Sequence, residues 1–170
     1  MLMAIMLTTF SVNVFADPYE FKSNSVGDIM YSFDEYTGEL VIQGRGKMQD
    51  FSSLNLPPWY YYKNRIASIK IEDGITYIGK CAFMDCICLT SVTVPDSVTE
   101  IGKMSFSGCT GLTYIEIPIN VTKISEDAFK GCLDLTAVIV CNDWIKIDKN
   151  TLDSYEKVTD AIYPGDTKPG

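Results

Sequence analysis

The clearest pattern of apolar and polar positions repeats along the chain every 23 residues. The copies begin at residues 66, 89, 112 and 135 and read IASIKIEDGITYIGKCAFMDCIC, LTSVTVPDSVTEIGKMSFSGCTG, LTYIEIPINVTKISEDAFKGCLD and LTAVIVCNDWIKIDKNTLDSYEK. An Ile or Leu opens each copy, and two apolar residues separated by one position follow. Side chains two residues apart lie on the same face of an extended strand. The pattern therefore predicts one short strand per copy, with a buried and an exposed face.

The second half of each copy pairs an aromatic residue with a cysteine. The pairs are Phe83 and Cys86, Phe106 and Cys109, and Phe129 and Cys132. This spacing is typical of a short helical turn that packs both side chains inward. We interpret the cysteines as stacked, buried thiols. Disulfides after secretion, or a metal site formed by Cys81, Cys86 and Cys88, are the alternatives.

A leading Leu, a short apolar alternation and a period in the range of about 20–29 residues are the signature of a leucine-rich solenoid. A single copy cannot bury its apolar face, but stacked copies form a continuous core with a parallel sheet along one side. We predict an α/β solenoid of about four coils. A β-hairpin would cap its amino-terminal end, and a degenerate segment would cap the carboxyl-terminal end.

The segments that flank the repeats have different compositions. Residues 1–16 are apolar and uncharged and end in Val14-Phe15-Ala16, which predicts a cleaved secretory signal peptide. A transmembrane helix is the rival interpretation, but the stretch is short for one and Asn13 interrupts it. We assign the remaining limits as 17–65 for the amino-terminal cap, 66–157 for the leucine-rich repeats and 158–170 for the carboxyl-terminal cap and tail.

Two features of the amino-terminal cap are expected from its residues. Alternating apolar residues in 28–43, with Thr37-Gly38 between the two runs, predict a β-hairpin. Trp59 and the three tyrosines after it form an aromatic cluster. We expect this cluster to cover the first coil, which would otherwise expose its core; a platform that stacks on sugars is the alternative.

Charge and composition exclude several functions. The net charge is −8, which argues against binding to nucleic acid and to anionic membranes, since both need clustered Lys and Arg. The chain contains no histidine, so it holds no Ser-His-Asp or Cys-His nucleophile system and no histidine metal ligand. The acidic residues form no recurrent pair at catalytic spacing. We therefore expect no enzyme activity, no cofactor and no metal.

Several motifs resemble the BspA-like (Treponema pallidum-type) leucine-rich repeat family of bacterial surface and secreted proteins. The matching segments are EDGITYIG at 72–79, Ala82-Phe83 with Cys86, VPDSVTEIG at 94–102, YTGEL at 36–40, Pro58-Trp59-Tyr60, and the tail from Asp143-Trp144. The resemblance implies an extracellular, non-enzymatic recognition module of the kind associated with adhesion to host proteins or other cells.

The outward positions of the predicted strands are the candidate ligand-binding residues. They are Lys70, Thr93, Tyr114, Glu116 and Ile139. Tyr114 is the best anchor because aromatic residues dominate binding hot spots. We expect a secreted or surface-displayed monomer whose concave strand face binds an extracellular or host protein, or a glycan. The alternative is a structural spacer or capping module without a ligand of its own.

Overall fold

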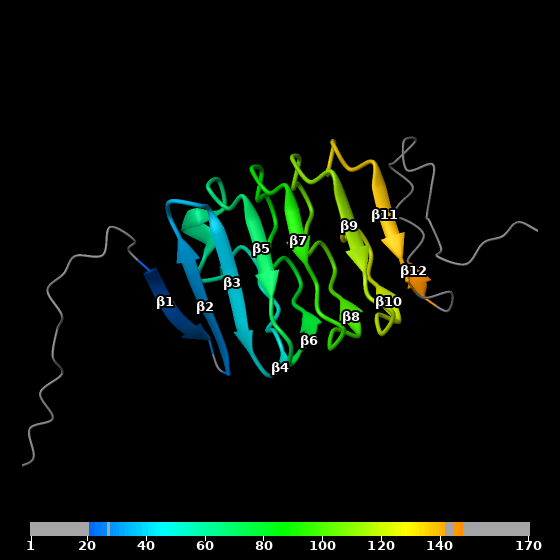
Figure 1. Cartoon of the computed structure of the whole chain (residues 1–170), viewed down its shortest axis with the longest axis horizontal. Coiled ribbons are helices and arrows are strands. Elements are labelled where there is room, and N and C mark those ends of the chain that lie inside the picture. The colour runs from blue at the N-terminus through cyan, green and yellow to red at the C-terminus, as the bar shows by residue number, and fades with distance from the viewer. Residues whose placement is uncertain (1–20, 27, 142–144, 148–170) are drawn as a thin grey trace, which may run out of the picture.

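The computed structural model describes residues 21–26, 28–141 and 145–147. The predicted signal peptide and carboxyl-terminal cap lie outside these residues. In the described part, short strands joined by turns wind repeatedly between two walls (Figure 1). The strands within each wall pair in parallel, except β1 with β2 and β2 with β3, which are antiparallel. The first wall comprises a sheet of order β1-β2-β3-β5-β7 and a pair, β11-β9; the second wall has the order β12-β10-β8-β6-β4. This arrangement is a repeat solenoid, as the sequence predicted.

The strand limits show how the copies contribute to each wall. The first wall contains β1 (Phe21–Val26), β2 (Ile29–Asp34), β3 (Glu39–Gly44), β5 (Ser68–Ile71), β7 (Ser91–Thr93), β9 (Tyr114–Ile117) and β11 (Ala137–Val140). The second wall contains β4 (Gly46–Lys47), β6 (Ile75–Ile78), β8 (Glu100–Ile101), β10 (Lys123–Ile124) and β12 (Lys146–Ile147). Ser68 pairs with Ser91, and Tyr114 with Ala137. Equivalent residues of successive copies therefore lie side by side.

The predicted hairpin is present, since β2 and β3 pair antiparallel. Gly38 in its turn has a φ of +74°, and a Cβ there would lie 2.6 Å from Arg65 O, so the turn requires glycine. Asp34 Oδ1 accepts the N–H groups of Tyr36 and Thr37 at 2.8 and 3.2 Å. The Tyr36 bond is the main cause that lowers the pKa of Asp34. The sequence analysis did not predict β1, which pairs antiparallel with β2.

The core is a stack of equivalent side chains from successive copies. The Phe83 and Phe106 rings stack at 5.3 Å, and the Phe106 and Phe129 rings stack at 5.6 Å. Trp59 extends this column, since its ring stacks on Phe83 at 5.6 Å and its Nε1 donates to Ala82 O at 2.7 Å. Most of the inward strand positions are also buried. The apolar columns of the sequence thus become one continuous core.

The helical half of the α/β prediction was wrong for the described residues. There the only helix is the 3-10 turn η1 (Tyr60–Tyr62). Phe83 N donates to Ser105 O at 2.8 Å, and Asp85 N donates to Ser107 O at 2.8 Å. These backbone groups bond to the next coil, which an α-helix would prevent because it uses its N–H groups internally. Repeat stacking therefore displaces the helical turn.

The column cysteines are buried thiols, as predicted. Cys109 Sγ lies 3.2 Å from Phe83 O, and Cys132 Sγ lies 3.1 Å from Phe106 O. These two thiols thus bond to the backbone of the preceding coil, and Cys86 is buried in the same column.

Candidate binding face

The strand face is the outward side of β5, β7, β9 and β11, and it carries the five candidate residues. Lys70, Thr93, Tyr114 and Glu116 are exposed, whereas Ile139 is half-buried. Register pairs Lys70 with Thr93 and Glu116 with Ile139. The Tyr114 side chain is 51 % exposed, although a large aromatic side chain usually packs against other residues of the protein. The structure therefore brings the predicted residues onto one surface; whether they bind a ligand stays a prediction.

A groove crosses the strand face where the first wall is interrupted. β7 ends one sheet and β9 begins the next pair, although the two strands lie side by side in Figure 1. The hollow has a volume of about 460 Å³. Its lining residues define the β7–β9 groove: Val92, Thr93, Val94, Asp96, Tyr114, Glu116, Pro118, Ile119 and Cys141. Three of the five candidate residues, Thr93, Tyr114 and Glu116, therefore lie in one depression.

The floor of the groove departs from the repeat pattern. Val92 and Val94 occupy the inward strand columns, where Ile115 and Ile117 of the next copy are 0 % exposed. Both valines are nevertheless only partly buried and line the groove. Sequence analysis missed them because a valine in an inward column predicts burial. Valine itself gave no signal, since the equivalent residues in β11 are also valines and are fully buried.

The loops that follow β7 and β9 are tied together beside the groove. Asn120 Nδ2 donates to Asp96 O at 2.8 Å. Cys141 N donates to Ile117 O at 3.1 Å, which continues the β9–β11 contact past the strand ends. These bonds position Asp96 and Ile119 at the rim without using the Asp96 carboxylate.

The strand face is acidic. A second hollow of about 570 Å³ adjoins the groove and shares Thr93, Val94 and Asp96 with it. The carboxylates that line the two hollows are those of Glu72, Asp73, Asp96 and Glu116. Lys70 is the only cation in this lining, and its Nζ pairs with Glu72 Oε1 at 3.2 Å. The remaining carboxylates give the surface a negative potential.

Cys141 adds a thiol to the rim of the groove. Its Sγ lies 3.7 Å from Glu116 Oε1. Desolvation, followed by the negative charge of Glu116, raises the pKa of Cys141. The thiol therefore stays protonated near neutral pH and is a weak nucleophile.

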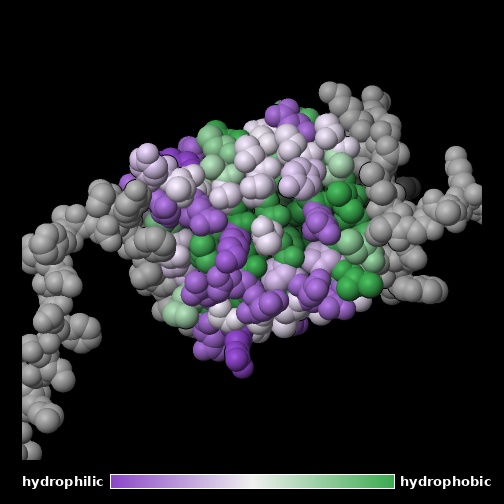
Figure 2. All heavy atoms as spheres, viewed as in Figure 1, coloured by the Kyte–Doolittle hydropathy of each residue, from purple (hydrophilic) through white to green (hydrophobic). Residues whose placement is uncertain are grey.

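Apolar and polar surface alternate over the strand face. Figure 2 shows green side chains among purple ones on the side that Figure 1 presents, over the half that contains β7, β9 and β11. Ile119, at the rim of the groove, is 59 % exposed. A surface with apolar contacts among charges is suited to bind another macromolecule.

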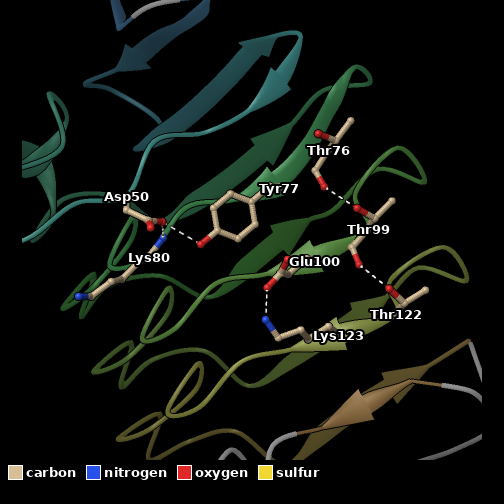
Figure 3. A network of polar contacts seen from close by, with 8 residues as sticks. All are labelled: Asp50, Thr76, Tyr77, Lys80, Thr99, Glu100, Thr122 and Lys123. Atoms are coloured by element: carbon tan, nitrogen blue, oxygen red, sulfur yellow. Dashed lines mark hydrogen bonds and ion pairs between the residues drawn. The ribbon is translucent and has the colours of Figure 1, made fainter.

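A second polar cluster has a structural explanation. Tyr77 Oη and Lys80 N both donate to Asp50 Oδ1 at 2.8 Å (Figure 3). Thr99 Oγ1 donates to Thr76 O at 3.1 Å, and Lys123 pairs with Glu100. These interactions join successive coils along the second wall, so its polar groups stabilise the stack.

The described residues provide neither a metal centre nor a membrane span. Within 21–26, 28–141 and 145–147, no three or more metal-ligating side chains of His, Cys, Asp or Glu are grouped to hold an ion. No helix in that part of the chain has the length and apolar character needed to cross a bilayer.

Comparisons with known proteins agree with this fold. Two bacterial leucine-rich repeat structures resemble it. One, from Eubacterium ventriosum, has 23% identity and a TM-score of 0.50, and the match covers 76% of this chain and 44% of that one. The other, from T. pallidum, has 17% identity and a TM-score of 0.54, and the match covers 74% of this chain and 64% of that one. The chain thus spans less than two thirds of either relative, and these likenesses show the fold alone.

Sequence comparison identifies the family. No curated protein matches the chain. Residues 56–168 match the family described as a BspA type leucine-rich repeat region of six copies. This match covers more than half of the sequence and includes every repeat found above. The chain therefore belongs to the BspA-type leucine-rich repeat family.

Proposed function

We propose that the chain is a protein-binding module that acts outside the cell and uses its strand face for adhesion. The observation that carries this proposal is the exposure of Tyr114 and its neighbours beside a groove, on strands held by the stacked core. Aromatic side chains on a rigid support lose little conformational entropy when they bind a partner. The BspA-type family membership also supports a recognition role.

An extracellular location is part of the same proposal. It is supported by the apolar residues 1–16, which fit a secretory signal peptide. We propose a monomer that binds an extracellular or host protein, or a glycan, without catalysing a reaction. The absence of histidine and the acidic net charge support a role other than acid–base catalysis or nucleic-acid binding.

The proposal is tested by capturing ligands with the purified chain. The baits are host matrix proteins, mucin glycans and the envelope of the producing cell. The double variant Tyr114→Ala/Glu116→Lys is compared with the unmodified chain. Tyr36→Ala serves as the matched control, since Tyr36 is 83 % exposed but lies in the turn between β2 and β3 and lines neither hollow.

We expect one ligand to bind the unmodified chain and the Tyr36→Ala control equally. The double variant should lose at least about 30-fold in affinity, the effect of one aromatic hot spot. Equal binding by the double variant would show that the strand face is the wrong surface. Failure of every bait to bind the folded chain would favour a structural spacer.

A further inference from the structure

The β7–β9 groove combines apolar and acidic surface in a way that restricts its partner. Val92 and Val94 form part of the floor, and the exposed side chain of Ile119 adds apolar surface. The carboxylates of Asp96 and Glu116 lie among these side chains. A partner that fills this groove must therefore offer apolar groups together with groups that suit carboxylates.

The charges around the groove favour a cation. Neither Asp96 nor Glu116 forms an ion pair with another described residue. Lys70, the cation of the adjoining hollow, already pairs with Glu72. An acidic partner would place like charges together, which costs binding free energy, whereas Lys or Arg side chains would complement the surface. Each exposed ion pair adds only a modest amount, so the apolar contacts must also contribute.

The dimensions of the groove favour side chains rather than an inserted strand. β7 and β9 already lie next to each other, so no further strand fits between them. A hollow of about 460 Å³ is at the small end of the range of ligand pockets. An extended segment that lies across the strand face presents alternate side chains to it.

We propose that the β7–β9 groove binds an extended polypeptide segment that carries basic side chains two positions away from an apolar one, on the same face of the segment. The apolar side chain enters the groove over Val92 and Val94, and Lys or Arg side chains pair with Asp96 and Glu116. This inference rests on the proposed protein-binding function and specifies the chemistry of the partner. Ile119 contacts the apolar side chain from the rim.

The test uses three short fluorescent peptides and anisotropy measurements at low and high salt. The first peptide carries Lys, Phe and Leu at every second position, with Phe in the centre and Ser at the positions between, so that all three residue types share one face of the extended peptide. The second replaces each Lys by Glu, and the third replaces Leu and Phe by Ser. The chain is compared with Asp96→Asn/Glu116→Gln and with Ile119→Ser. The matched control is Glu39→Gln/Asp134→Asn, which removes the same charge from exposed residues that line neither hollow.

We expect only the Lys-Leu-Phe peptide to bind. The Asp96→Asn/Glu116→Gln variant should weaken binding roughly 2- to 30-fold, the range for two exposed ion pairs, and raised salt should weaken it further. Ile119→Ser should also weaken binding, whereas the Glu39→Gln/Asp134→Asn control should not. Far-ultraviolet circular dichroism confirms that each variant folds.

The inference is overturned if no peptide binds, if the Glu peptide binds as well as the Lys peptide, or if the two double variants behave alike. None of these results would contradict a captured ligand whose binding depends on Tyr114. In that case the proposed protein-binding function would stand, but the partner would have a different chemistry. If no bait is captured and no peptide binds, the proposed function itself is wrong.

Discussion

At the scale of single residues, the column of stacked rings carries much of the core. Phe106 is fully buried, and its ring lies between those of Phe83 and Phe129. Because coils lie on both sides of it, the surroundings cannot collapse easily into the space that its removal would leave. Stability at this position therefore depends on the rings of both neighbouring copies.

We expect Phe106→Ala to lower the free energy of unfolding by about 3–5 kcal/mol, through lost apolar contact and an unfilled cavity. Guanidinium unfolding followed by circular dichroism measures the change. Leu133→Ala is the control, because Leu133 is 72 % exposed; it should change stability by less than about 0.5 kcal/mol. A cost below 1 kcal/mol for Phe106→Ala, on the order of a surface change, would contradict the stacked column.

The hydrogen bond of the Tyr77 hydroxyl makes the stability of the folded chain depend on pH. Its hydroxyl donates to Asp50 Oδ1 at 2.8 Å. Burial, followed by the hydrogen bond and negative charge of Asp50, raises the pKa of Tyr77 in the folded chain. The folded state therefore favours the protonated phenol relative to the unfolded state.

Tyr77→Phe should cost about 0.5–1.5 kcal/mol at neutral pH, because the hydrogen bond to Asp50 is lost. For the unmodified chain this contribution is fully present below the ordinary tyrosine pKa of about 10. It is lost as the pH rises through the raised pKa of the folded chain. Urea unfolding between neutral and strongly alkaline pH should show the two proteins converging as pH rises. A constant difference across that range would rule out the coupling.

At the scale of elements, the chain between the walls is shaped by close contact between coils. Gly102 N donates to Ile78 O at 2.9 Å. A Cβ at Gly102 would lie 2.6 Å from Ile78 O and 2.8 Å from Lys80 N. Both are backbone atoms, so they cannot rotate away as the end of a side chain would. The glycine is needed for the approach of two coils.

Gly102→Ala should destabilise the chain by about 1–3 kcal/mol, the usual cost of overpacking a tight contact. Thermal unfolding measures this loss of stability. Thr113→Ala is the control variant, since Thr113 is exposed. A melting temperature for Gly102→Ala equal to that of the control would show that the coils can separate without cost.

Elements differed in how far the sequence predicted them. The hairpin of β2 and β3 followed from local alternation and a Thr37-Gly38 turn. The segment around Phe83 was expected to be helical because spacing of three is compatible with a helix. Its N–H groups instead bond to residues of the next copy, such as Ser105 O. Local spacing cannot reveal a bond partner that stacking brings into reach.

At the scale of the whole molecule, the interruption of the first wall separates two parts of the strand face. β5 has a paired strand on each side, whereas β7 lies at the end of its sheet. Val92 and Val94, which are partly exposed, line the groove at this interruption. The boundary between the two sheets and the candidate groove are thus the same feature.

We expect the amide groups of β7 to exchange with solvent faster than those of β5, because fewer neighbours must separate for β7 to open. Hydrogen exchange with mass spectrometry compares peptides from the two strands. Binding of the Lys-Leu-Phe peptide should slow exchange in β7 and leave β2 unchanged. Equal protection of β5 and β7 before binding would contradict a weakened boundary.

The sequence by itself determined that the chain stacks its copies into a solenoid and which residues occupy the strand face. Apolar columns spaced 23 residues apart can be buried only against one another, so periodicity alone specifies this arrangement. The limits of the caps and the signal peptide stay predictions.

Only the tertiary structure decided that the Phe and Cys segments are non-helical turns and that a groove opens between β7 and β9. Both depend on contacts between residues of different copies, such as Phe83 N with Ser105 O. Val92 in β7 and Val94 directly after it are partly exposed, whereas the equivalent Val138 and Val140 of β11 are buried. Because the residue type is the same, the difference in exposure comes from the tertiary surroundings, which the sequence pattern does not show.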